Sequence, residues 1–116
     1  MKELQGLQAS PYPLSEDEWK ALKTIKERDY GSTAELCKAL ADPARLRIIE
    51  ALGVKELCVC VLVEMTGLRY SALSYHLKTL KEVDLVSYRK DGNFLIYSLT
   101  PKGKAIHAFI SESRKL

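Results

Sequence analysis

An amphipathic helix pattern runs directly into a hairpin pattern near the middle of the chain, and this succession constrains the fold most. Between residues 70 and 83, leucines recur at the spacing that places them on one face of a helix. They are Leu73, Leu77 and Leu80. The spacing predicts a helix that buries its leucines and turns its polar side chains outward.

The hairpin pattern begins immediately after this helix. Residues 85–88 and 94–99 are rich in aliphatic and aromatic side chains, as strands commonly are. Asp91 and Gly92 lie between them, and Asp-Gly is typical of a tight turn in which both central positions adopt positive φ. The region predicts an antiparallel two-stranded wing with its turn at this dipeptide.

Helix patterns also occupy the rest of the chain after residue 15. They are expected over residues 16–28, from Thr33 to about 40, from Pro43 to Gly53, over 60–65 and after Pro101. Capping side chains precede four of them: Ser15 with Glu18, Thr33, Asp42 and Thr100. Gly53 and Gly67 are predicted to end two helices in the left-handed conformation.

This order of elements predicts a mostly α protein with a small β-hairpin, an α+β winged helix-turn-helix. We expect an irregular arm over residues 1–14 and a single domain over residues 15–116. The apolar stripe of the last helix (Ala105, Ile106, Phe109 and Ile110) predicts contact with a partner subunit. Apolar runs far shorter than the roughly 20 residues of a membrane span, and no secretory signal pattern, make cytoplasm the expected location.

Basic residues gather beside the predicted central helix and wing. Residues 69–104 hold seven Lys or Arg against three Asp or Glu, whereas residues 1–68 hold nine against eleven. Because the net charge is only +3, this local excess is the more informative quantity. It favours double-stranded DNA as a partner.

Polar side chains near the start of the central helix and at the wing are the candidate DNA contacts. In a winged helix-turn-helix the second helix of the pair enters the major groove, and wing cations reach the backbone. The helix candidates are Arg69, Tyr70, Ser71, Ser74, Tyr75, His76 and Lys78, and the wing candidates are Arg89, Lys90 and Asn93. For His76, the sequence allows either contact with the groove or a bond to the core. For the wing residues, the alternative to DNA contact is that they are charged turn residues exposed to solvent.

A thiol pair precedes the central helix. Cys58 and Cys60 are two residues apart, and thiolates favour soft metals or metalloids. Two sulfurs leave the site incomplete, since trivalent arsenic takes three ligands and tetrahedral zinc four. Cys37 is a possible third ligand or, since free cysteine is commonly buried, a core residue. Simple packing and reversible oxidation remain alternatives for the pair.

Three stretches in this order resemble the ArsR/SmtB family of metal- and metalloid-responsive repressors. They are KALADPARLRII at 38–49, ELCVC at 56–60 and SYHLKTL at 74–80. The resemblance spans about residues 33–100. It implies a homodimer formed by the terminal helices that binds an inverted-repeat operator and is released when an inducer binds the thiols. No obligatory cofactor is implied beyond a possible soft metal or metalloid inducer ion.

The chain departs from the family pattern at several positions. Val61 replaces an aspartate, Val63 stands where some members have a further cysteine, and Tyr75 stands where arginine is common. The last helix offers only His107 and Glu112 toward the family's second metal site, so no site is predicted there.

Three functions therefore compete on this fold. The first is a repressor released when arsenite, antimonite, cadmium or lead binds Cys58 and Cys60, and the second is a thiol redox-sensing regulator. The third is a winged-helix protein-interaction or architectural module that uses its basic face without an operator. An enzyme is not expected, because the sequence shows no nucleophile with a histidine and acid and no phosphate-binding glycine loop.

Overall fold

The computed structural model describes residues 11–116. The chain divides into two compact units, one ending at Gly31 and the other running from Ser32 to Leu116. Residues 1–10 of the predicted arm lie outside the described residues, and residues 11–14 have no regular secondary structure. The boundary of a single domain at residue 15 stays a prediction.

Helix α2, Glu16–Glu27, lies in the first unit. Ser15 accepts a hydrogen bond from the Glu18 N–H at 3.1 Å, and Glu18 accepts one from the Ser15 N–H at 2.8 Å. This reciprocal pair confirms the predicted capping box. No residue of α2 is buried, so its apolar side chains remain uncovered in this unit.

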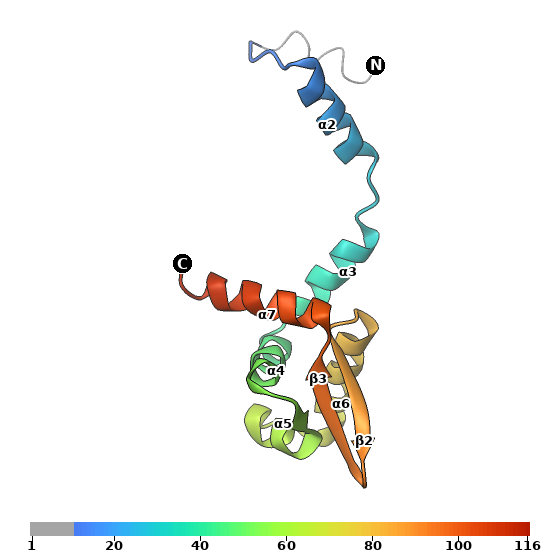
Figure 1. Cartoon of the computed structure of the whole chain (residues 1–116), viewed down its shortest axis with the longest axis vertical. Coiled ribbons are helices and arrows are strands. Elements are labelled where there is room, and N and C mark those ends of the chain that lie inside the picture. Colours follow the sequence, from blue (N-terminus) through green and yellow to red (C-terminus); the bar gives the residue numbers. More distant parts are fainter. Residues whose placement is uncertain (1–10) are drawn as a thin grey trace. The chain divides into compact units, whose positions relative to one another are not determined.

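The second unit contains the helix pair and the wing (Figure 1). Its elements are α3 (Gly31–Leu40, beginning at the unit boundary), α4 (Pro43–Val54), β1 (Leu57–Cys58), α5 (Val59–Thr66), α6 (Tyr70–Glu82), β2 (Val86–Asp91), β3 (Phe94–Leu99) and α7 (Pro101–Ser113). Helices α5 and α6 followed by the β2–β3 hairpin form a winged helix-turn-helix, which confirms the predicted fold class. Among the described residues, no helix is long and apolar enough to cross a membrane.

The small sheet has the strand order β1-β3-β2, and both pairings are antiparallel. Asp91 pairs with Phe94, so the turn consists of Gly92 and Asn93. Gly92 has a φ of 61°, whereas Asn93 does not have a positive φ. The prediction of Asp91-Gly92 as the two turn residues was therefore wrong by one position, and one glycine is enough to make this turn.

The core joins α4, α5, α6, β2 and α7. Leu73, Leu77 and Leu80 are almost fully buried, as the helix pattern predicted. Burying such a leucine side chain contributes roughly 1.5 to 3 kcal/mol relative to leaving it exposed. They pack with residues from every neighbouring element, including Ile48, Ile49, Leu52, Leu62, Leu85, Val86 and Ile110. This packing fixes which face of α6 remains open to solvent.

Two predicted helix limits were wrong. Thr33 lies inside α3, whose start is instead supported by Asp29 accepting a hydrogen bond from the Gly31 N–H at 2.8 Å. Gly53 does not end α4 and is not left-handed, because the helix continues to Val54. A Cβ at Gly53 would overlap the His107 ring of α7, so this glycine serves the close approach of two helices.

The other predicted caps were right. Asp42 caps α4 by accepting from the backbone N–H groups of Ala44 and Arg45, and Gly67 ends α5 with a φ of 68°. Thr100 caps α7 by accepting from the Gly103 N–H at 3.0 Å. Its hydroxyl also donates to the Asp84 carbonyl at 2.6 Å, which ties the start of α7 to the α6–β2 turn.

Candidate functional site

The open face of α6 presents short polar and aromatic side chains. Ser71, Ser74 and Lys78 are exposed, and Tyr70 and Tyr75 are 58% and 62% exposed. The buried leucines lie on the opposite face, so this orientation follows from the core. Hydroxyl, phenol and ammonium groups on one exposed helix face are suited to donating hydrogen bonds to phosphates and base edges.

His76 is half-buried and is hydrogen-bonded to α4. The Arg45 Nε–H donates to His76 Nδ1 at 3.0 Å, and a second Arg45 nitrogen donates to the Ala39 carbonyl at 3.2 Å. The Arg45 guanidinium also lies 5.8 Å from the centre of the Tyr75 ring. Of the two alternatives for His76, the structure therefore favours the internal bond. Arg45 is a site residue that the sequence did not single out.

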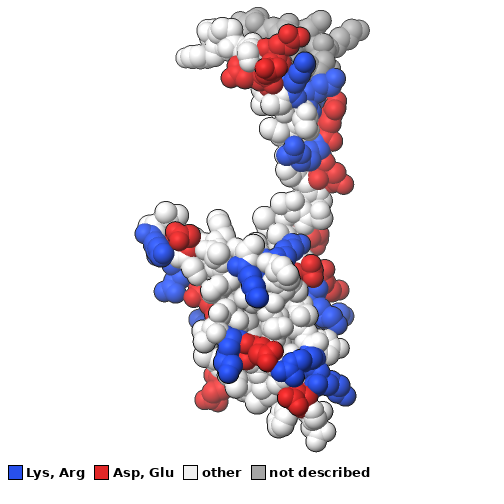
Figure 2. Space-filling view, viewed as in Figure 1, with Lys and Arg blue, Asp and Glu red and all other residues white. Residues whose placement is uncertain are grey.

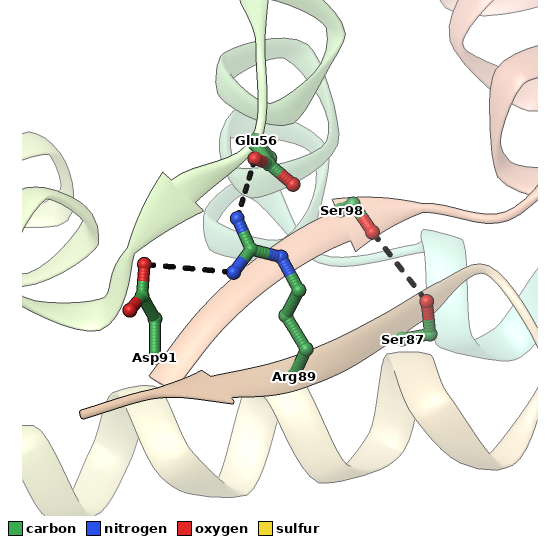
Figure 3. A network of polar contacts seen from close by, with 5 residues as sticks. All are labelled: Glu56, Ser87, Arg89, Asp91 and Ser98. Atoms are coloured by element: carbon green, nitrogen blue, oxygen red, sulfur yellow. Dashed lines mark hydrogen bonds and ion pairs between the residues drawn. The ribbon is translucent and has the colours of Figure 1, made fainter. Parts of the chain in front are cut away.

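The wing cation Arg89 is engaged by two carboxylates. Its guanidinium contacts Glu56 at 2.7 Å and Asp91 at 3.6 Å, and Figure 3 shows it between these two groups. The hydrogen bond from Arg89 lowers the pKa of the Glu56 carboxyl below its ordinary value. Lys90 is exposed and has no ion pair within the described range.

Acidic and basic side chains are interspersed on the face drawn in Figure 2. The wing is consequently not a uniformly positive surface. Its most basic strand carries an acid at its end, Asp91, and faces another across the sheet, Glu56. The role predicted for Arg89 in DNA contact thus depends on whether a phosphate displaces these carboxylates, and the roles of Lys90 and Asn93 stay predictions.

The thiol pair lies at the start of α5. Cys58 is the N-cap of this helix and accepts a hydrogen bond from the Cys60 N–H at 3.3 Å. A hydrogen bond from the Cys60 side chain, with backbone N–H groups of Cys60 and Val61, lowers the pKa of the Cys58 thiol. The same side-chain bond raises the pKa of Cys60. The pair therefore favours a thiolate at Cys58 and a thiol at Cys60.

We expect this asymmetry to appear in thiol labelling. The rate of iodoacetamide labelling, followed by mass spectrometry against pH, should reach half its maximum at a lower pH for Cys58 than for Cys60. Comparing midpoints removes the effect of access, since Cys60 is exposed and Cys58 is half-buried. Coincident midpoints would contradict the hydrogen-bonded pair, and Cys60→Ser should show how much of the shift depends on that thiol.

A hollow of about 440 Å³ lies between the thiol pair, the start of α6 and the tip of the wing. Cys58 and Cys60 line one part of it, Tyr70 at the start of α6 another, and Asn93 and Phe94 at the wing tip a third. Val59, Val63 and Leu95 complete an apolar lining. The hollow thus brings together three groups of residues that the sequence singled out separately.

Cys37 lies elsewhere in the second unit. It is exposed on α3 and lines a different hollow with Leu40, Phe109 and Ile110, so the expectation of a buried core cysteine was wrong. Within residues 11–116, no group of three or more His, Cys, Asp or Glu side chains is arranged to hold a metal. Cys58 and Cys60 fit a soft ion as two of its ligands, and the role of Cys37 as a third stays a prediction.

Comparisons with known proteins agree with this arrangement. Residues 42–88, from the N-cap of α4 into β2, match the model of the arsR family of bacterial regulatory proteins. The chain is 47% identical over 66 residues to a transcriptional repressor SmtB homolog of Synechocystis sp., a match covering 57% of this chain and 50% of that relative. It is 40% identical over 70 residues to the arsenical resistance operon repressor of Staphylococcus xylosus, covering 60% and 67%.

Solved structures share the fold. The crystal structure of Rv0081 from M. tuberculosis matches with a TM-score of 0.68 and 36% identity, covering 74% of this chain and 88% of the other. The fold, with its exposed α6 helix and its wing, is that of a winged helix-turn-helix regulator of transcription. Proteins of this family regulate transcription and are not enzymes. The chain belongs to the ArsR/SmtB family.

Proposed function

We propose that this protein is a transcriptional repressor that binds an inverted-repeat operator as a homodimer and leaves it when a soft metal or metalloid binds Cys58 and Cys60. The observation that carries the proposal is the hollow lined by both thiols, Tyr70 and Asn93. A ligand held there would touch the start of the recognition helix and the wing tip together. In this proposal the protein acts in the cytoplasm, in contact with double-stranded DNA.

The polar face of α6 supports DNA contact. Ser71 and Ser74 are small, so the helix backbone can approach base edges closely, while the exposed Arg69 and Lys78 can reach guanine or phosphate. Two of the relatives that match this region are described as repressors. The proposed contacts are Arg69 at the N-cap of α6, Tyr70, Ser71, Ser74, Tyr75 and Lys78 within α6, and Arg89, Lys90 and Asn93 from the wing.

Uncovered apolar side chains support the homodimer. Phe109 on α7 is 66% exposed, and Val54 at the end of α4 is 82% exposed. Leu22 and Ile25 on α2 are also exposed within their own unit. Apolar surface on both terminal helices is what a second copy would cover, and two copies would present α6 to half-sites about 34 Å apart.

Soft-ligand chemistry supports the proposed inducer. A thiolate favoured at Cys58, beside the Cys60 thiol, suits arsenite, antimonite, cadmium or lead. The remaining ligand would come from Cys37, from a second copy or from a thiol in solution. Release requires that the ligand bind the DNA-free state more tightly, and allosteric coupling of this kind typically amounts to about 1 to 3 kcal/mol.

The double variant Cys58→Ser, Cys60→Ser tests this proposal. We expect arsenite to weaken operator binding by the reduced wild type about tenfold or more, in line with that coupling. The double variant should bind the operator normally and lose the response. Fluorescence anisotropy with a labelled operator duplex gives both values.

Cys37→Ser is the matched control, because it removes the one other cysteine of the chain. An equal arsenite response in the double variant would overturn the thiol site, and loss of the response in Cys37→Ser would make Cys37 a ligand. Titrating cadmium in the same way separates metals from metalloids. Release by an oxidant but by neither ion would favour the redox regulator instead.

A further inference from the structure

We infer that Glu56 competes with DNA phosphate for Arg89, so that this carboxylate sets how strongly the wing holds the DNA backbone. The inference rests on the proposed DNA-binding function and deepens it. It concerns a residue that lies outside both the recognition helix and the thiol pair. Glu56 would act on DNA binding only through Arg89, as a competing anion, and would make no DNA contact itself.

The two partners are distant in sequence and close in the fold. Glu56 immediately precedes β1, Arg89 lies on β2, and they are 33 residues apart. An Arg89 terminal nitrogen donates to Glu56 Oε1 at 2.7 Å, while the other lies 3.6 Å from Asp91 Oδ2. Figure 3 shows both terminal nitrogens of Arg89 directed at carboxylates. These are the nitrogens that a bidentate phosphate contact would use.

The exchange of one anion for another is feasible at this position. The side chains of Arg89 and Glu56 are 53% and 47% exposed, so a phosphate can reach the guanidinium. Exposed ion pairs contribute little net stability, because water already solvates both charges. A DNA phosphate can therefore displace Glu56, and the cost of that displacement reduces the apparent affinity for DNA.

The position of Glu56 also brings this exchange close to the thiols. In the sheet, Cys58 pairs with Ile96 of β3, and Ile96 pairs with Arg89 of β2. Cys58 and Arg89 thus occupy one row across three strands, and Glu56 stands two residues before Cys58. A shift of β1 would change the hold of Glu56 on the wing cation.

The test compares Glu56→Gln with Glu64→Gln. Both variants remove one negative charge from an exposed position, and Glu64 on α5 has no ion pair within the described range. We expect Glu56→Gln to bind an operator duplex and an unrelated duplex about two- to fivefold more tightly than Glu64→Gln does. The gain should be equal on both duplexes, because phosphates carry no sequence information.

The salt dependence and a second background make the result specific. The slope of log K against log salt should steepen by about 0.9 for each additional phosphate contact. In an Arg89→Gln background, Glu56→Gln and Glu64→Gln should bind DNA equally. Thermal unfolding followed by circular dichroism checks that all variants are folded, and Glu56→Asp, with its shorter reach, should be intermediate.

The inference would be overturned by equal affinities for Glu56→Gln and Glu64→Gln, by a gain confined to the operator duplex, or by a gain that persists without Arg89. Weaker binding by Glu56→Gln would also overturn it, since Glu56 would then hold Arg89 in its DNA-binding position. Failure of the proposed function would appear separately, as absence of operator binding by the wild type.

Discussion

Gly103→Ala is expected to destabilise the winged domain by about 2 to 3 kcal/mol, although alanine is normally the better helix former. Gly103 is buried in the first turn of α7, and a Cβ there would overlap the Leu85 carbonyl oxygen and crowd the Leu99 side chain. A backbone carbonyl cannot rotate away as a side chain can. The Leu85 carbonyl also accepts from the Thr100 N–H at 3.1 Å, so moving it would disturb the start of α7.

Gly53→Ala is the informative comparison for this prediction. There the added methyl would meet the His107 ring, a side chain that can move, so we expect a smaller loss than at Gly103. Denaturant unfolding of the purified variants gives both free energies. Equal or increased stability of Gly103→Ala would show that the close packing of α7 on the α6–β2 turn is not maintained in solution.

Ser74→Glu is expected to weaken operator binding on the order of 100-fold or more. Ser74 is exposed near the middle of α6, where a carboxylate would repel phosphates and fill the space that a base edge needs. Each good base contact contributes about 1 to 3 kcal/mol of discrimination, and a homodimer would lose the contact twice. Fluorescence anisotropy at fixed salt measures the loss.

Ser32→Glu is the matched control for this change. Ser32 is also an exposed serine on a helix, but it lies on α3 rather than on the recognition helix. It should retain operator affinity within about threefold, as expected for a change outside the interface. If Ser74→Glu bound the operator as well as Ser32→Glu, the open face of α6 would not be the DNA-binding surface.

The helices, their caps and the wing could be predicted because their signals are local. The leucine spacing of α6, Ser15 with Glu18 and Asp42 before Pro43 each act within a few residues. The family resemblance was likewise visible in short motifs. The errors at Thr33 and Gly53 arose where the local sequence pattern allowed two outcomes. Asp29, not Thr33, supports the start of α3. Gly53 makes room for the His107 ring instead of ending α4.

The polar contacts of the site could not be predicted because they join distant segments. Arg45 reaches His76 across 31 residues, and Arg89 reaches Glu56 across 33. Nothing in the sequence around either arginine indicates its partner. Residue type alone suggested DNA contact for Arg89, whereas the fold adds a carboxylate that opposes it.

The thiol site was predictable in part. The proximity of Cys58 and Cys60 to the recognition helix followed from the order of the chain, and the hollow that joins them to Tyr70 agrees with it. The exposure of Cys37 could not be predicted from the sequence, because cysteine is usually buried in proteins. Its neighbours Leu36 and Leu40 are themselves only partly buried. Which face of α3 is open depends on helices that come much later in the chain.

The strand order has a consequence for the behaviour of the molecule at high concentration. Because β3 is central, β2 is an outer strand, and an outer strand exposes backbone groups that can recruit a strand from another molecule. Beyond Val86 every residue of β2 is exposed, and Arg89, Lys90 and Asp91 are charged. These charges disfavour strand addition, and β1, at the opposite edge, is only two residues long. The sheet is thereby protected against edge-to-edge aggregation.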